Sequence, residues 1–136
     1  MKQEDKILRV IDANFNRCKE GLRVCEDIFR FILEDDSLRR RIRQIRHGLD
    51  AVASGKIIKT AAAMRDSISD LGRNTDALEF KRKNYDDLVY INLQRTKESL
   101  RVLEECFKIV DKTQVKPLKA LRYRTYTMER DFLLKK

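Results

Sequence analysis

The sequence contains the same sixteen-residue pattern twice. Residues 14–29 read NFNRCKEGLRVCEDIF and residues 92–107 read NLQRTKESLRVLEECF, and the two align without a gap. Nine of the sixteen positions are identical, whereas roughly one or two would match by chance between helices of this composition. Such a repeat predicts a fold assembled from two related halves.

Each copy lies within a stretch of helical periodicity. Apolar residues recur three and four positions apart, as in a helix that buries one face. In the first copy these residues are Ile11, Phe15, Cys18, Leu22, Cys25, Phe29 and Ile32. The chain has only four glycines and one proline, so few residues interrupt helices. The periodicity therefore predicts one long helix in each half.

A shorter basic segment follows each copy and is repeated as well. Ile42-x-x-Ile45-Arg46-His47 is matched by Leu118-x-x-Leu121-Arg122-Tyr123. Each half thus consists of a long helix, a turn and a basic helix. We predict an all-α fold in which four long helices form two pseudo-twofold-related helical hairpins in a bundle, with a long central loop that carries short helical turns.

The predicted boundaries follow from the same pattern. We expect a single domain over residues 1–136, with the internal repeat at 4–54 and 85–135 and a linker at 55–84. Asp35-Asp36-Ser37 is expected to end the first helix and cap the second, which should end near Ser54-Gly55. A short helix is predicted over 56–64, and Thr113 is expected to cap the last helix. A loop as long as 66–84 is usually functional or disordered.

Composition and charge exclude several classes of protein. No run of about 18 apolar residues occurs and the N-terminus lacks an apolar signal segment, so we expect no membrane span, no secretion and a cytoplasmic protein. Three cysteines and one histidine, without metal-ligand spacing, disfavour disulfides and zinc. The net charge of +9 is concentrated around 39–46 and 116–130. The arginine run at 39–43 is more typical of a solvated helix face than of a binding site.

One edge of the apolar stripe carries the most informative polar residues. Asn14, Arg17 and Gly21 lie together on it, and Asn92, Arg95 and Ser99 repeat them in the second copy. A glycine inside a helix costs about 1 kcal/mol relative to alanine, so close helix packing or a ligand should justify Gly21. Arginine forks and asparagine amides are suited to binding phosphate. The alternative is structural: the arginines would pair with Glu20 and Glu98.

Further candidates lie outside this edge. Arg46 and Arg122 follow core positions of the basic helices and could face the same cavity. His47 is the only histidine, and a structural role is more usual for it than catalysis. Asp66 and Asp70, next to Arg65, could hold Mg²⁺ together with substrate phosphates or could cap the loop.

No glycine-rich phosphate-binding loop occurs. Any nucleotide must therefore be held by side chains and helix ends. The pattern of residues favours a phosphorylated small molecule over a nucleic acid as the ligand.

Ordered motifs along the chain resemble a known family. They are Ile11-Asp-Ala-Asn14-Phe-Asn-Arg17-x-x-Glu20-Gly21-Leu-Arg23, Ile45-Arg46-His47, Arg65-Asp66-Ser67 with Asp70-Leu71-Gly72, Asn92-x-x-Arg95-x-x-Glu98-Ser99-Leu-Arg101, and Ala120-Leu121-Arg122-Tyr123. Over about residues 11–129 the chain resembles the all-helical hydroxymethylpyrimidine-phosphate kinase family, the domain often fused N-terminal to thiamine-phosphate synthase. Ser67 and Leu71 are conservative departures from the expected threonine and valine.

The resemblance implies an activity and its cofactors. The expected reaction is ATP-dependent phosphorylation of 4-amino-5-hydroxymethyl-2-methylpyrimidine phosphate to the pyrophosphate in thiamine biosynthesis, with Mg²⁺. For this reaction we assign catalytic phosphate contacts to Arg17, Arg46, Arg95 and Arg122. We assign substrate binding to Asn14, Asn92, Arg65 and His47, and metal binding to Asp66 and Asp70. A separate thiamine-phosphate synthase is an expected partner, and the sequence also allows a homodimer.

Two rival interpretations stay open. The net charge would also suit a helical module that binds nucleic acid, although only 7% of residues are aromatic and the two repeated helices balance acid against base. A non-catalytic helical module that docks onto a thiamine-biosynthesis enzyme is the second rival.

Overall fold

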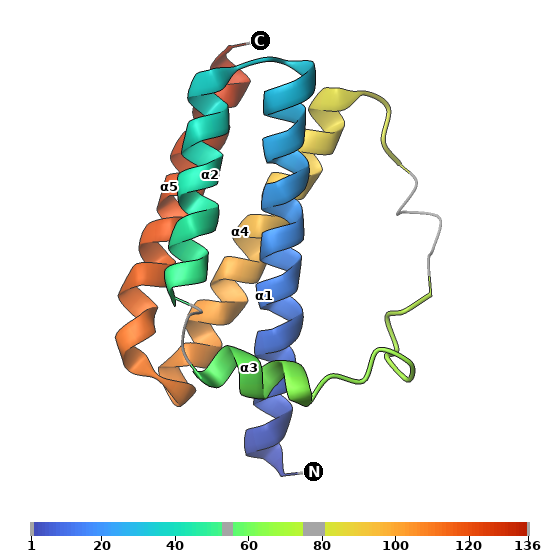
Figure 1. Ribbon diagram of the computed structural model, residues 1–136, viewed down its shortest axis with the longest axis vertical. Helices are drawn as coiled ribbons and strands as arrows, with labels where there is room; N and C mark the ends of the chain where they lie inside the picture. The colour runs from blue at the N-terminus through green and yellow to red at the C-terminus, as the bar shows by residue number, and fades with distance from the viewer. Residues whose placement is uncertain (1, 53–55, 75–80, 136) are drawn as a thin grey trace.

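Four long helices lie side by side and close into a ring of contacts (Figure 1). The computed structural model describes residues 2–52, 56–74 and 81–135, and this part of the chain contains no strand. The long helices are α1 (Gln3–Asp27), α2 (Asp36–Val52), α4 (Tyr85–Val110) and α5 (Val115–Leu134). Both α1 and α5 contact α2 and α4. The prediction of an all-α fold is confirmed.

Three short elements complete the described chain. A single π-helical turn, η1 (Ile28–Ile32), extends α1, and a 3₁₀ turn, η3 (Lys112–Gln114), joins α4 to α5. The short helix expected over 56–64 is α3 (Lys56–Ala63), which packs against α1. The described parts of the loop between α3 and α4, residues 64–74 and 81–84, lie to one side of the four long helices (Figure 1). The expected end of the second helix at Ser54-Gly55 lies outside the described residues, and α2 ends at Val52.

The helix boundaries differ in detail from the sequence-based expectations. The chain turns at Glu34, whose φ of 52° is in the left-handed region, and Asp35 then caps α2 by accepting the Leu38 N–H at 3.0 Å. Thr113 was expected to cap the last helix, and this is wrong. Asp111 caps η3 by accepting the Thr113 N–H and hydroxyl, because its carboxylate is free to reach both donors.

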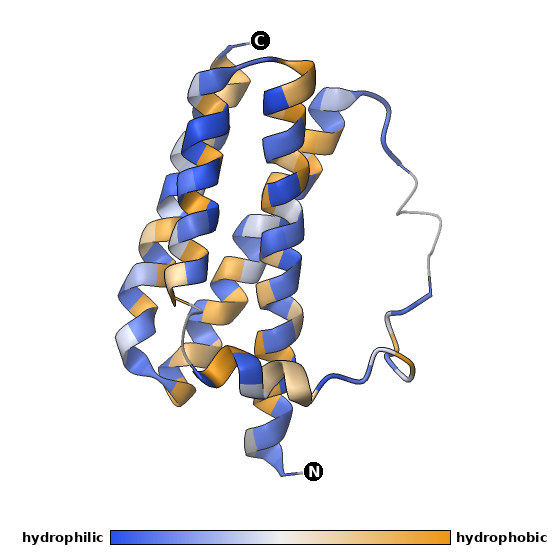
Figure 2. Ribbon diagram, viewed as in Figure 1, coloured by the Kyte–Doolittle hydropathy of each residue, from blue (hydrophilic) through white to orange (hydrophobic). Residues whose placement is uncertain are grey.

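The apolar stripes of the helices face one another and form the core. Figure 2 shows hydrophobic and hydrophilic residues on each long helix, as amphipathic helices require. Phe29 and Phe132 meet near one end, with ring centroids 5.7 Å apart. Cys18 and Cys25 are fully buried, and burial raises the pKa of the Cys18 thiol to about 12, so it is a packing residue rather than a nucleophile. Within the described residues, no helix is long and apolar enough to cross a bilayer.

Gly21 sets the closest approach of α1 to α4. A Cβ atom at this position would lie 2.7 Å from the Thr96 hydroxyl oxygen and 2.9 Å from the Asn92 carbonyl oxygen. The second of these atoms belongs to the backbone of α4, so a side chain could be admitted only by moving the helix. Close helix packing therefore justifies the glycine.

Each hairpin has one ion-pair cluster that joins its two helices, and the two clusters are equivalent. Glu26 on α1 accepts hydrogen bonds from Arg23 at 2.7 Å and from Arg46 of α2 at 3.2 Å. In the second half, the carboxylate of Glu104 on α4 receives the guanidinium of Arg122 on α5 through two N–H groups. Glu104 is only 1% exposed, and its hydrogen bond with Arg122 raises the pKa of that guanidinium above the ordinary arginine value.

Replacing Gly21 tests the close crossing. We expect Gly21→Ala to lower the free energy of unfolding, because overpacking costs about 1–3 kcal/mol and exceeds the gain of about 1 kcal/mol in helix propensity. Gly48→Ala is the matched control, since its Cβ would meet only the end of the Leu121 side chain, which can rotate away. Urea unfolding followed by circular dichroism measures both. Equal stabilities for the two variants would contradict the assignment.

A second prediction concerns the buried carboxylate. Glu104→Ala should destabilise the protein by about 3–5 kcal/mol, because it leaves the buried Arg122 charge without its partner. Glu105→Ala, one residue along, removes only exposed pairs with Arg101 and Lys108 and should change stability little. Thermal and urea unfolding of the two variants gives the comparison, and a small effect of both would show that the Arg122–Glu104 pair is dispensable.

Candidate functional site

The close crossing of α1 and α4 brings the two repeated edges to one cavity. This inter-helix cavity has a volume of about 460 Å³. Six of its lining residues are the repeated set: Asn14, Arg17, Gly21, Asn92, Arg95 and Ser99. Glu20, Glu98, Val102 and the loop residue Gly72 complete it. The sequence repeat therefore corresponds to one shared hollow rather than to two separate surfaces.

The two asparagines are held in the same way on their helices. The side-chain amide of Asn14 donates to the Val10 carbonyl at 2.9 Å, and that of Asn92 donates to the Leu88 carbonyl at 2.8 Å. Both side chains are more than nine-tenths buried. One amide hydrogen of each is used in this bond, which leaves the second hydrogen and the amide oxygen to serve a ligand in the cavity.

The two arginines of the cavity are not used to hold the fold together. Arg17 and Arg95 are both exposed, and among the described residues neither has an ion-pair or hydrogen-bond partner. The structural alternative, in which they pair with Glu20 and Glu98, is not seen. Both glutamates line the same cavity, so the charges share one wall without forming direct pairs.

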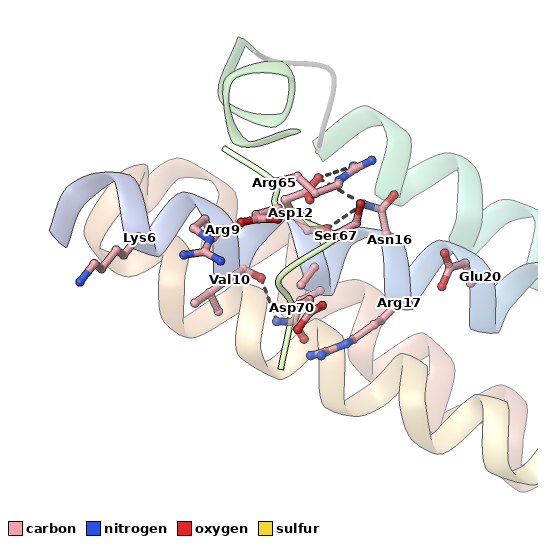
Figure 3. Close-up of a pocket in the computed structure, with 13 residues that line it drawn as sticks. Lys6, Arg9, Val10, Asp12, Asn16, Arg17, Glu20, Arg65, Ser67 and Asp70 are labelled. Atoms are coloured by element: carbon pink, nitrogen blue, oxygen red, sulfur yellow. Dashed lines mark hydrogen bonds and ion pairs between the residues drawn. The ribbon is translucent and has the colours of Figure 1, made fainter. Parts of the chain in front are cut away.

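A second cavity adjoins the first on the loop side of α1 (Figure 3). This loop-side cavity has a volume of about 620 Å³. Its charged lining residues are four basic and four acidic side chains among those described: Lys6, Arg9, Arg17, Arg65, Asp12, Glu20, Asp66 and Asp70. Asn14, Arg17 and Glu20 line both cavities.

A bidentate ion pair fastens the start of the loop to α1. Two guanidinium N–H groups of Arg65 donate to the two carboxylate oxygens of Asp12, each at 2.7 Å. Asp12 is 4% exposed and also accepts from Asn16 at 3.1 Å. The hydrogen bonds to Asp12, together with its charge, raise the pKa of Arg65 above its ordinary value. Arg65 therefore lines the loop-side cavity, but its guanidinium is largely occupied by Asp12.

Each of the two loop aspartates accepts a backbone N–H of its own loop. One carboxylate oxygen of Asp66 accepts the Ser69 N–H and one of Asp70 accepts the Gly72 N–H, both at 3.0 Å. The hydrogen bond from the Ser69 backbone is the main cause that keeps the pKa of Asp66 below its ordinary value. Loop capping, the structural alternative from the sequence, is therefore present, and both aspartates also line the loop-side cavity.

The donor set suits Mg²⁺ held partly by a substrate. No cluster of three or more histidine, cysteine or acidic side chains that could hold a metal occurs among the described residues. Mg²⁺ is usually bound through one or two carboxylates together with substrate phosphates. Asp66 and Asp70 both line the loop-side cavity and carry carboxylate oxygens, so they fit that kind of site.

Three predicted site residues lie elsewhere. Arg46 and Arg122 line neither cavity, because each is drawn to the buried glutamate of its own hairpin, Glu26 or Glu104. The expectation that they face the same cavity as the repeated arginines is corrected. His47 is exposed on α2 and is also not among the described residues that line either cavity.

Part of the cavity lining was not predicted from the sequence. Lys6 and Arg9 on α1 line the loop-side cavity, and Glu20 and Glu98 line the inter-helix cavity. The signal was present, because Lys6, Arg9, Ala13 and Arg17 follow helical spacing along one face. Glu20 and Glu98 are identical in the two repeats, but they were considered only as partners for the arginines.

Comparison with known proteins places this chain in a family. The ThiD2 family model matches residues 9–131. The thiamine-phosphate synthase of Synechocystis sp. is 39% identical over 128 residues, which are 93% of this chain and 36% of that protein. The thiamine-phosphate synthase of Rhodopirellula baltica is 37% identical over 131 residues, which are 95% of this chain and 35% of that protein. That of Nostoc punctiforme is 32% identical over 128 residues, which are 93% of this chain and 35% of that protein.

The chain thus spans about a third of the length of these relatives. No solved structure matches it. Since the family model covers all the residues that line the inter-helix cavity and nearly the whole described helical core, the protein belongs to the ThiD2 family.

Proposed function

We propose that this protein is a kinase of thiamine biosynthesis. It transfers a phosphoryl group from ATP to 4-amino-5-hydroxymethyl-2-methylpyrimidine phosphate and releases the pyrophosphate and ADP. The observation that carries the proposal is the inter-helix cavity, in which the repeated asparagines and the unpaired Arg17 and Arg95 converge. The relatives named thiamine-phosphate synthase support the pathway.

The proposed chemistry asks for charge neutralisation rather than for a strong base. The acceptor is already a phosphate oxyanion, so one of its oxygens can attack the γ-phosphorus of ATP without prior loss of a proton. The bond from the γ-phosphorus to the β–γ bridging oxygen breaks, and ADP leaves. Phosphoryl transfer of this kind depends on positioning and on cations around the crowded oxygens. Arg17 and Arg95 supply fixed positive charge there.

The balance of charge in the cavities favours a metal-bound substrate. Arg17 and Arg95 face Glu20 and Glu98 in the inter-helix cavity, and the loop-side cavity also carries equal numbers of acids and bases. A phosphate group without a bound metal ion would be attracted only weakly by a cavity lining that has no net charge. Bound Mg²⁺ adds two positive charges on the phosphate oxygens, and Asp66 and Asp70 are the residues that would hold it.

The relatives also point to a partner. Because they carry about two thirds of their length outside the region that matches this chain, we propose that thiamine-phosphate synthase is the enzyme with which this protein works.

A direct assay tests the activity. Purified protein, ATP, Mg²⁺ and the pyrimidine phosphate should yield a product heavier by one phosphoryl group, detected by mass spectrometry, and chelation of Mg²⁺ should stop its formation. Failure to convert the pyrimidine phosphate at saturating nucleotide and magnesium would refute the kinase proposal and leave the docking module as the better account.

Arginine variants test the assignment of the cavity. Arg95→Ala should lower kcat/KM by roughly 10- to 100-fold, because a hydrogen bond to a charged group contributes about 1.5–3 kcal/mol, while its melting temperature stays close to that of the unmodified protein.

Arg46→Ala is the matched contrast, since Arg46 pairs with Glu26. It should lower the melting temperature and leave the activity per folded molecule unchanged. The reverse pattern, with Arg95 needed for folding and Arg46 for turnover, would show that the two repeated arginine pairs have been assigned the wrong roles.

A further inference from the structure

The two cavities meet along one wall. Asn14, Arg17 and Glu20 on α1 line both of them. Arg95 on α4 lines only the inter-helix cavity, whereas Arg9 near the start of α1 lines only the loop-side cavity. Ligands that occupied the two cavities would therefore be neighbours at Arg17.

We propose that the two cavities separate the two substrates of the reaction. On this proposal, which rests on the kinase function proposed above, the inter-helix cavity binds the pyrimidine phosphate and the loop-side cavity binds the nucleotide. Arg17, on the shared wall, contacts the phosphoryl group that passes between them.

The loop-side cavity suits the more highly charged ligand. A nucleoside triphosphate carries more negative charge than a monophosphate and binds with a divalent cation. Lys6 and Arg9 add two cations that the inter-helix cavity lacks, and the carboxylates of Asp66 and Asp70 are on this side only. It is also the larger cavity, at about 620 Å³ against 460 Å³.

The inter-helix cavity suits the smaller ligand. Its walls come mainly from two packed helices, so their positions are fixed by the core. Among the described residues, the arginines that line it are Arg17 and Arg95. Two buried asparagine amides with spare hydrogen-bonding capacity suit the edge of an aminopyrimidine ring, because that edge offers an N–H donor beside a ring nitrogen acceptor. One phosphate between two arginines matches the monophosphate.

The position of Arg17 accounts for the transfer step. A phosphate oxygen of the ligand in the inter-helix cavity forms the new bond to the γ-phosphorus, and the bond from that phosphorus to the β–γ bridging oxygen breaks with its electron pair going to ADP. The transferred group moves from one cavity toward the other. Arg17 is the arginine that lines both cavities and has no ion-pair partner among the described residues. Its guanidinium can therefore contact the negatively charged phosphoryl group throughout the transfer.

Separate binding of each ligand tests this division. Isothermal titration calorimetry is run with the pyrimidine phosphate alone, and with the β,γ-imido analogue of ATP plus Mg²⁺, on the whole chain. The variants are Arg95→Ala, Arg9→Ala and Arg17→Ala, and the control is Arg43→Ala, an exposed arginine on α2 that lines neither cavity. Circular dichroism verifies that each variant is folded.

The proposal gives a distinct pattern for each variant. Arg95→Ala should weaken binding of the pyrimidine phosphate by roughly 10-fold or more and leave the nucleotide analogue within about twofold. Arg9→Ala should do the opposite, Arg17→Ala should weaken both, and the control should weaken neither. If Arg95→Ala and Arg9→Ala affect both ligands alike, or in exchanged order, the division is wrong although the kinase function stands. An unmodified protein that binds neither ligand refutes both proposals.

Discussion

The close approach of α1 to α4 at Gly21 is the contact on which the rest of this structure depends. Because Gly21 carries no side chain, the backbone of α4 at Asn92 can lie directly against it. At that crossing the apolar stripe of α1 packs against that of α4, and α2 and α5 cover the rest of the core. It also places the polar edge of one repeat opposite the polar edge of the other. The core and the candidate site are thus consequences of the same helix pair, and a change in the helix spacing would alter both.

Duplication has given two sets of arginines with different roles. In each half, an arginine of the second helix is held by a buried glutamate of the first, as Arg122 is by Glu104. The arginine of the first helix, Arg17 or Arg95, is left without a described partner and faces the cavity. The protein is destabilised when a buried charge loses its partner, whereas an unpaired charge on a cavity wall is available to a ligand. The geometry therefore separates residues that sequence alone made look equivalent.

The sequence was sufficient for features that depend on periodicity. The helices, the short α3 and the shared edge of Asn14 and Arg17 all follow from three- and four-residue spacing and from the repeat. Features that depend on distance between helices were missed. The pairing of Arg46 with Glu26 spans two helices. A local sequence pattern does not indicate how two helices are rotated about their axes, so it could not predict this pair. The identity of Glu26 with Glu104, beside apolar positions in both halves, was the signal that could have revealed it.

The proposed function requires that the two repeated edges form one phosphate-binding cavity. A crystal structure of the protein with the pyrimidine phosphate bound tests this most directly. We expect the phosphate to lie between the guanidinium groups of Arg17 and Arg95, with an asparagine amide against the ring. A ligand found instead on the outer faces of α2 and α5, with both guanidinium groups untouched, would contradict it.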